Sequence, residues 1–147
     1  MSSHKRFGLH QVLSYRKELE RLRKLEFAAA KRNLDDACDL LEQEQRNAAR
    51  LADEFAANQE KLTSVVDLQL YANFFARKRQ ELKVQQARIE ELDQMLEVQR
   101  QQLQAATTEK KVMEQLKVKQ DAAFRKEQAH KEALLLDEIA VQKKGQE

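Results

Sequence analysis

The sequence predicts an all-α protein, a long antiparallel two-helix coiled-coil hairpin, and three observations support this prediction. The 147-residue chain has no proline and only two glycines, Gly8 and Gly145, so no strong helix breaker lies between its ends. Charged residues make up 35% and aromatic residues 5% of the chain, a balance typical of long helices. Apolar residues recur every seven positions, which is the spacing of a coiled-coil seam.

The first predicted helix runs from about residue 9 to about residue 60, and a seven-residue repeat marks its seam. The repeat consists of Phe27, Leu34, Leu41, Ala48, Phe55 and Leu62, with Ala30, Ala37 and Leu51 in the second seam position. An upstream set keeps the rhythm but is shifted in phase; it consists of Val12, Tyr15, Leu19 and Leu22. We expect this shift to produce a local irregularity in the supercoil.

A turn is predicted at residues 61–66, because the seam phase is lost there and polar residues gather around it. These polar residues are Asn58, Thr63, Ser64 and Asp67. The segment from Ser64 to Asp67 resembles a capping box in which Asp replaces the usual Glu. We therefore expect the second helix to begin near residue 67.

The second predicted helix runs from about residue 67 to about residue 142. Its seam consists of Leu82, Ile89, Leu96 and Leu103, with Leu92, Ala106 and Met113 at the partner positions. Farther on, the rhythm drifts through Val112, Leu116, Ala123 and Phe124 to Leu134, Leu135 and Ile139. At 1.5 Å per residue the two helices would span roughly 75 and 110 Å. One short connection favours an antiparallel hairpin, and we expect the whole chain, residues 1–147, to form a single coiled-coil domain.

Several positions of the predicted seam hold polar residues. They are Glu44, Asn58, Gln85, Gln99 and Lys110. Single helices of this polarity are marginal in water, so the contact between the helices has to supply the stability. We expect a seam that is only moderately stable.

Charge and hydropathy argue against several classes of protein. The chain has 27 basic and 25 acidic residues and a net charge of +2, whereas nucleic-acid binding normally requires a larger basic surplus. No segment approaches the roughly 20 apolar residues of a membrane span, and the N-terminus lacks the apolar run of a signal peptide. We therefore expect a cytoplasmic protein that neither binds nucleic acid nor inserts directly into a membrane.

The sequence offers no arrangement of residues suited to catalysis. His4, His10 and His130 lack the spacing of a metal site, and the single cysteine, Cys38, cannot form an intrachain disulfide. Neither a phosphate-binding glycine loop nor a nucleophile elbow is present in the sequence. We expect a protein that is not an enzyme and that holds no cofactor or metal.

Two regions exceed what a plain coiled coil requires. Next to the turn, three of the eight aromatic residues lie within five positions; they are Tyr71, Phe74 and Phe75. They either close the end of the seam, together with Phe55, or remain exposed as a docking patch. In the second helix, Leu134, Leu135 and Leu136 precede Asp137 and Glu138. Three adjacent leucines cannot all face one seam, so they either widen the core against the basic N-terminus or form a second surface.

The chain resembles the flagellar type III export protein FliJ family in three places. The first is the N-terminal pattern of Phe7, Leu9, Val12, Leu13, Arg16 and Glu20. The second is the pattern of Leu70, Tyr71 and Phe74 followed by Gln85 and Gln86. The third is the closing run of Leu103, Ala106, Glu109, Lys110, Lys111, Leu116, Lys117, Glu132, Leu136, Asp137 and Glu138. The chain departs from the family pattern at Ser64-Val65-Val66, in place of a glycine-containing segment, and at Lys78, in place of leucine.

The resemblance implies a specific role. FliJ-like proteins are antiparallel coiled coils similar to the central stalk subunit of rotary ATPases. The chain would bind and activate the hexameric flagellar export ATPase and couple it to the cytosolic domain of the export-gate membrane protein. It would also bind export chaperones and work at the cytoplasmic face of the inner membrane, in type III protein transport for flagellum assembly, motility and chemotaxis.

The resemblance and the hairpin topology together assign residues to two contacts. The gate contact falls at the tip of the hairpin, on Phe55, Tyr71, Phe74 and Phe75. The ATPase contact falls at the open end, on Arg16, Lys110, Lys111, Asp137 and Glu138. Other readings are a prefoldin-like holdase chaperone, a generic coiled-coil adaptor that forms a homodimer, and a nucleic-acid binder. A β-hairpin would favour the first of these, and salt-dependent binding of DNA or RNA the last.

Overall fold

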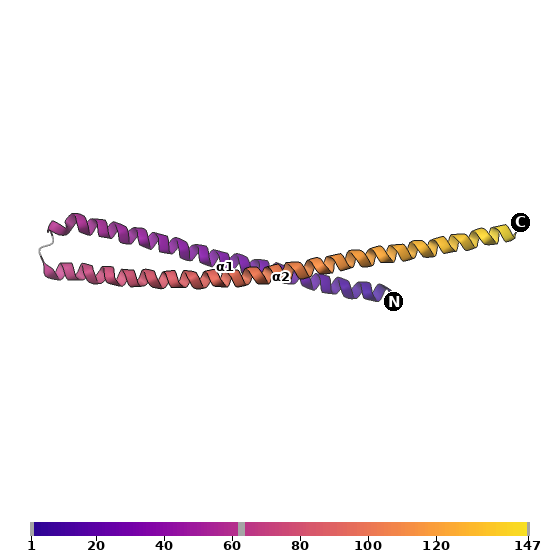
Figure 1. Cartoon of the computed structure of the whole chain (residues 1–147), viewed down its shortest axis with the longest axis horizontal. Helices are drawn as coiled ribbons and strands as arrows, with labels where there is room; N and C mark the ends of the chain where they lie inside the picture. Colours follow the sequence, from indigo (N-terminus) through magenta and orange to yellow (C-terminus); the bar gives the residue numbers. More distant parts are fainter. Residues whose placement is uncertain (1, 62–63, 147) are drawn as a thin grey trace. The chain divides into compact units, whose positions relative to one another are not determined.

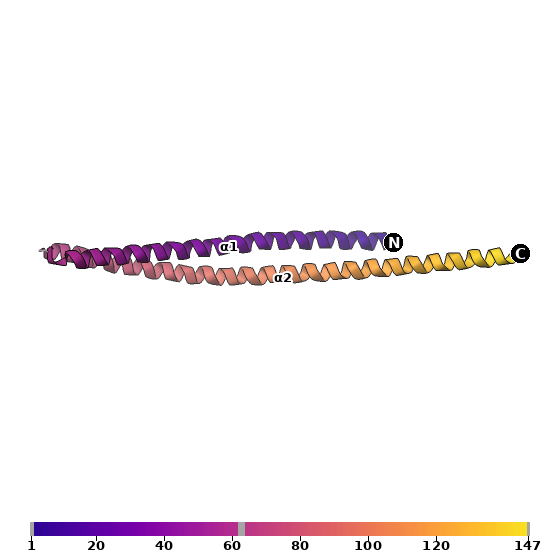
Figure 2. The ribbon, with the colours of Figure 1, turned by 90° about the horizontal axis from the view of Figure 1, so that it is seen from above.

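The computed structural model describes residues 2–61 and 64–146, with side chains from residue 8 onward. Helix α1 spans Ser2–Asn58, the short 3-10 helix η1 spans Gln59–Lys61, and helix α2 spans Val65–Gly145. Strands are absent from the part of the chain that the structure describes. The long helices lie side by side (Figures 1 and 2), so the predicted all-α, two-helix hairpin is confirmed.

The helix ends around the turn follow from the local sequence. The backbone amide of Leu68 donates a hydrogen bond to the carbonyl of Ser64 at 3.3 Å, which makes Ser64 the residue that caps α2. Helix α2 therefore starts just before the predicted residue 67, and α1 starts at Ser2, well before the predicted residue 9. The predicted seam residue Leu62 and turn residue Thr63 lie outside the described residues.

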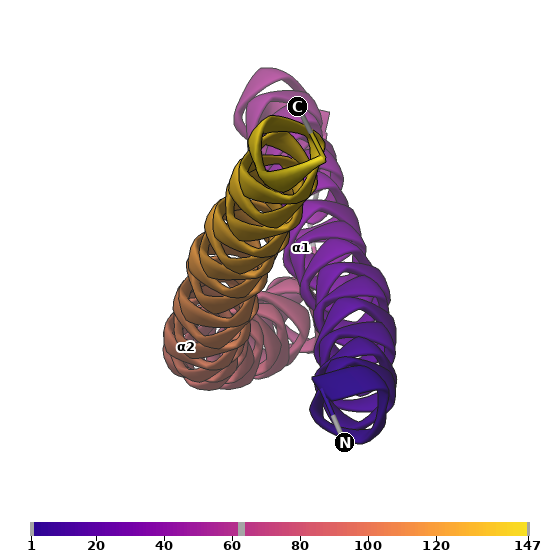
Figure 3. The same ribbon diagram turned by 90° about the vertical axis from the view of Figure 1, so that its right-hand side faces the viewer.

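The fold divides into two compact units. The terminal unit combines Met1–Leu22 with Gln104–Glu147, and the hairpin unit comprises Arg23–Leu103. In the terminal unit, the start of α1 and the end of α2 both face the viewer in Figure 3. In the hairpin unit, α1 and α2 are joined through the turn (Figure 1).

The seam of the hairpin unit repeats in alternating steps of three and four residues. On α1 the half-buried positions are Arg23, Phe27, Ala30, Leu34, Ala37, Leu41, Glu44, Ala48, Leu51 and Phe55. On α2 the buried and half-buried positions in this repeat are Phe75, Lys78, Leu82, Gln85, Ile89, Leu92, Leu96, Gln99 and Leu103. These positions include every described seam residue that the seven-residue spacing predicts for this unit, apart from Asn58, which is exposed.

The terminal unit corrects the predicted phase shift. Val12, Tyr15 and Leu22 are 42%, 62% and 44% exposed, so they do not form the seam. The fourth member of the predicted set, Leu19, is half-buried beside it. Leu13, which is 4% exposed, packs in the core instead, and the charged Arg16 and Glu20 take the next seam positions. The prediction was wrong because charged residues, Arg16 and Glu20, occupy seam positions, so the apolar pattern no longer marks the repeat there. Apolar residues on the solvent face nearby recur with the same spacing in a shifted phase.

The predicted drift in α2 is likewise wrong at Val112, Leu116 and Ala123, which are exposed. Val112 and Leu116 are 56% and 46% exposed, whereas Gln120 and Phe124 are half-buried and keep the spacing set by Ala106. Ala106 is 3% exposed and forms the core of the terminal unit with Leu13. The heptad spacing therefore continues along α2 as far as Phe124, with an exposed residue, Lys117, at one of its positions.

Beyond Phe124, every described residue is exposed, from Arg125 to Gln146. Leu134, Leu135 and Leu136 are 53%, 58% and 65% exposed. The reading in which these leucines widen a local core therefore finds no support among the described side chains. The other reading, a second surface, agrees with their exposure.

Candidate functional site

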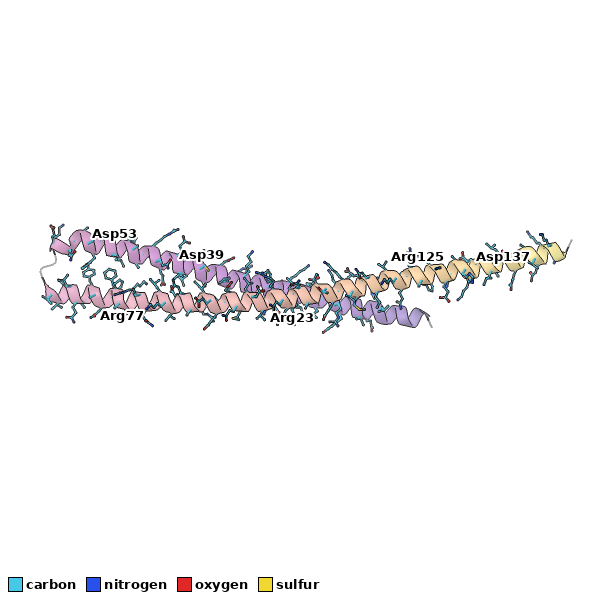
Figure 4. All side chains as sticks on the ribbon, viewed as in Figure 1. Arg23, Asp39, Asp53, Arg77, Arg125 and Asp137 are labelled. Atoms are coloured by element: carbon cyan, nitrogen blue, oxygen red, sulfur yellow. The ribbon has the colours of Figure 1, made fainter. Side chains whose placement is uncertain are left out.

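An aromatic cluster closes the turn end of the hairpin unit. The ring of Phe55 on α1 lies 4.7 Å from that of Tyr71 and 6.0 Å from that of Phe75, measured between centroids. On α2, the ring of Phe75 also lies 5.6 Å from that of Phe74. Figure 4 shows aromatic rings between the two helices in the region of the labelled Asp53 and Arg77. The structure thus brings together all four residues that the sequence placed at the tip.

The four rings play two different parts. Phe55 and Phe75 are half-buried and occupy the seam, whereas Tyr71 and Phe74 are 38% and 40% exposed. Contacts at these centroid distances add about 0.5–1.5 kcal/mol per pair beyond burial of area. Two rings therefore close the seam, as the first reading expects, while two others reach the surface; this exposure is what the docking-patch reading requires, and the docking itself stays a prediction.

An apolar groove lies beside the exposed rings. It encloses about 430 Å³ and is lined by Leu51, Asp67, Leu70, Tyr71, Phe74 and Phe75. Leu70 is 62% exposed, so this residue offers apolar surface without a partner among the described residues. Asp67 supplies the only charge among the lining residues. We define these six residues as the tip groove.

Arg16 and Lys110, which the sequence placed in the open-end contact, form ion pairs between the helices of the terminal unit. Arg16 pairs with Glu109, and Nζ of Lys110 lies 3.1 Å from a carboxylate oxygen of Glu20. Glu20 is 5% exposed, which makes it the one buried charged residue among the described side chains. Arg16 and Lys110 therefore help to hold α1 and α2 together.

The other open-end residues are exposed, and they do not form one cluster. Lys111, Asp137 and Glu138 all lie on α2. Lys111 and Asp137 are separated by roughly 40 Å along this helix, at 1.5 Å per residue. The structure thus places the predicted residues at two separate parts of the terminal unit. Asp137 and Glu138 adjoin the exposed leucines, while Lys111 lies next to the ion-paired Lys110.

A second polar layer crosses the seam of the hairpin unit. The amide nitrogen of Gln85 donates a 2.8 Å hydrogen bond to Glu44, and Nζ of Lys78 lies 3.6 Å from the same carboxylate. Lys78 departs from the leucine of the family pattern, and its pairing with Glu44 explains how a charge is tolerated there. Spacing alone had indicated Glu44 and Gln85 as seam residues, but not Lys78.

Sequence reasoning also missed two charged seam positions of α1, Glu20 and Arg23. Arg23 donates a 3.0 Å hydrogen bond to Gln102 within the hairpin unit, and Glu20 pairs with Lys110 within the terminal unit. Counting back from Phe27 in steps of four and three residues reaches these positions. The signal was therefore present in the spacing, although it was absent from the apolar pattern.

Among the described residues, no group of three His, Cys, Asp or Glu side chains could hold a metal ion, and Cys38 is exposed. Hydrogen bonds from Arg21 lower the pKa of Glu18, but this carboxyl lies in solvent on the outer face of α1. In addition, no described helix is long and apolar enough to cross a membrane.

Comparison with known proteins identifies the family. The family model described as the flagellar FliJ protein matches residues 5–147, nearly the whole chain. Searches of curated proteins and of solved structures give no significant match. The helical hairpin and the motifs at both of its ends agree with this assignment. The chain belongs to the FliJ family and is a component of flagellar protein export.

Proposed function

We propose that the chain acts as the coiled-coil stalk of the flagellar export apparatus, which binds and activates the export ATPase ring and couples it to the export gate. One observation carries this proposal: each of the two units presents its own exposed apolar surface. The hairpin unit presents the tip groove, and the terminal unit presents the exposed end of α2. A coupling protein needs two such surfaces, because each partner must be held independently.

The tip groove is the proposed contact with the cytosolic domain of the export-gate membrane protein. Exposed aromatic side chains set in a packed surface are the usual anchors of protein interfaces. Tyr71 and Phe74 have this character. Their rings contact the half-buried rings of Phe55 and Phe75, which hold them in place. In this arrangement Phe74 contacts the partner directly, whereas Phe55 supports the contact through Tyr71 and Phe75.

The end of α2 is the proposed contact with the ATPase ring. Leucines exposed on several sides of one helix are costly in water, and they become favourable when a partner covers them. Asp137 and Glu138 would direct this segment to a basic surface of the ring. Lys111 offers a further exposed charge, while Arg16 and Lys110 act indirectly by keeping the two helices together.

The same protein would bind export chaperones at the cytoplasmic face of the inner membrane. Its exposed surfaces carry both signs of charge, since the chain has 27 basic and 25 acidic residues. Such surfaces favour reversible protein contacts with fast association. Chaperone exchange during export would require contacts of this kind.

Stimulation of the export ATPase tests the proposed role. We expect the chain to raise ATP hydrolysis by the export ATPase of the same organism. The double substitution Asp137→Lys and Glu138→Lys should remove most of this stimulation, because it reverses the charge beside the exposed leucines. Steady-state phosphate release measures the effect. Circular dichroism should show that the helices remain intact, since both side chains are exposed.

Lys83→Glu is the matched control, because Lys83 is an exposed charge on α2 in the hairpin unit. This variant should stimulate the ATPase as the wild-type chain does. An equal loss with Lys83→Glu would show that any charge reversal on α2 is harmful and would contradict the assignment to the end of the helix. If the wild-type chain neither binds nor stimulates a competent ATPase, the stalk proposal is wrong.

A further inference from the structure

The tip groove has a linear order of side chains along one helix. Asp67, Leu70 and Phe74 are spaced by three and four residues on α2, so they lie along one face of that helix. Leu51 of α1 forms the opposite wall of the groove. At 1.5 Å per residue, the three positions on α2 are separated by roughly 4.5 and 6 Å along the helix axis. The groove thus presents one acidic position followed by two apolar positions, each about one turn from the next.

Its walls come from two adjacent helices, which is the setting in which a third helix packs well. An amphipathic helix binds a hydrophobic groove through apolar residues at positions i and i+4 or i+3. The volume of about 430 Å³ falls within the range of roughly 300–1,000 Å³ for sites that bury a ligand of several side chains. The exposed apolar surface of Leu70, Tyr71 and Phe74 would be covered in such a complex.

Asp67 gives the groove a preference for a positively charged group of the partner. Its side chain is exposed, and it forms no ion pair with another described residue. It also lies in the first turn of α2, where a carboxylate is compatible with the helix dipole and need not be neutralised within the chain. The carboxylate is therefore available to an incoming cation at one end of the apolar stripe.

We propose that the tip groove recognises an amphipathic helix of the partner that carries two large apolar side chains one turn apart and a Lys or Arg about one turn beyond them. The apolar pair packs against Leu70 and Phe74, and the cation pairs with Asp67. This inference rests on the proposed gate contact and specifies its chemistry. The apolar contact supplies most of the affinity, and the charge fixes the direction in which the helix binds.

Two synthetic helical peptides provide the test. Both carry two leucines at positions i and i+4; one carries Lys at i+8, and the other carries Glu there. Binding to the full-length chain is measured by fluorescence anisotropy at low salt. We expect the Lys peptide to bind about two- to five-fold more tightly than the Glu peptide. This ratio corresponds to the free energy of a partly exposed ion pair. Asp67→Lys should reverse this preference, and Phe74→Ala should weaken both peptides about equally.

Asp53→Asn is the matched control, because Asp53 is an exposed carboxylate on α1 that does not line the groove. It should leave the preference between the two peptides unchanged. Three results would overturn the inference: no binding of either peptide, equal binding of both by the wild-type chain, or an effect of Asp53→Asn as large as that of an Asp67→Asn variant. Self-association that depends on Asp67, seen by sedimentation, would also overturn it, because the groove would then hold a second copy of the chain.

The same variants are then measured against the cytosolic domain of the export gate. Loss of gate binding with Phe74→Ala but not with Asp67→Lys would leave the gate contact standing and refute the proposed charge selection. Unchanged gate binding with both variants would refute the gate contact itself. Weakened gate binding with both, together with the reversed peptide preference, is the result that we expect.

Discussion

Replacing Glu20 with lysine is expected to lower the free energy of unfolding by about 2–3 kcal/mol. Glu20 is 5% exposed and pairs with Lys110, so the substitution places two ammonium groups together in the seam of the terminal unit. Breaking a fully buried pair typically costs about 3–5 kcal/mol, and the smaller value applies because the Lys110 side chain retains 22% of its exposure. Urea unfolding followed by circular dichroism measures the change.

The exchanged double variant, Glu20→Lys with Lys110→Glu, should recover at least half of this loss. Complete recovery is not expected, because each exchanged charge lies near a charge of the same sign. The new cation at position 20 lies one turn from Arg16 on α1, and the new carboxylate at position 110 follows Glu109 on α2. Glu18→Lys is the matched control, since Glu18 is exposed on the same turn of α1 and pairs only locally with Arg21. If the control is as damaging as Glu20→Lys, the buried pair has no special role.

We expect the Glu20–Lys110 pair also to set the register of α1 against α2 within the terminal unit. An apolar pair at these positions would be about as stable, because desolvation of two charges offsets most of their attraction. An apolar pair would, however, also pack against residues one turn away on the facing helix, with almost the same free energy. We therefore expect Glu20→Leu with Lys110→Leu to keep its stability but to broaden the set of helix pairings. Cysteine cross-linking between α1 and α2 would detect the additional pairings.

Replacing Phe55 with alanine is expected to lower the free energy of unfolding of the hairpin unit by about 2 kcal/mol. The ring is half-buried and contacts both Tyr71 and Phe75, so its removal takes away burial and two aromatic contacts at once. The value lies below the roughly 3–5 kcal/mol of a fully buried phenylalanine because part of the ring faces solvent. Thermal unfolding gives the overall change, and hydrogen exchange shows whether it is concentrated around the turn.

Phe74→Ala should behave in the opposite way. Phe74 is 40% exposed and contacts Phe75 only from the side, so its removal should change stability by less than about 1 kcal/mol. Binding to the gate domain should nevertheless weaken by roughly tenfold or more, as expected for an aromatic anchor. Equal loss of stability in both variants would contradict the division of the cluster into a supporting half and a contacting half.

We expect the polar residues of the seam to limit the stability of the fold. The side-chain oxygens of Gln85 and Gln99 are buried without a hydrogen-bond partner among the described residues. Each such group costs about 1–3 kcal/mol relative to a satisfied one. Only Leu13, Leu92, Leu96 and Ala106 are buried apolar residues among those described. The sequence prediction of a moderately stable seam agrees with this arrangement.

Spacing and composition were enough to establish the fold class. The chain has no proline, and it has no glycine between residues 8 and 145, so no residue in that stretch is a strong helix breaker. The apolar residues from Phe27 to Phe55 repeat with the period of a coiled coil, so their burial was predictable. The four tip aromatics could also be grouped in advance, because a single turn brings the end of α1 beside the start of α2. The motifs were sufficient to indicate the FliJ family, which the family match then confirmed.

Other features depended on contacts between residues far apart in the chain. Arg16 and Glu20 look like solvent-exposed charges in the sequence, and only the opposing Glu109 and Lys110 allow them to replace apolar residues in the seam. The separation of Tyr71 and Phe74 from Phe55 and Phe75 likewise required the packed structure, because exposure depends on which face meets the other helix. The sequence by itself determined the helices and their period; the tertiary structure decided which polar residues the seam accepts and which apolar residues remain for partners. The physical reason is that a charge is tolerated in a seam only when its partner comes from the facing helix, and a sequence read along one helix does not contain that partner.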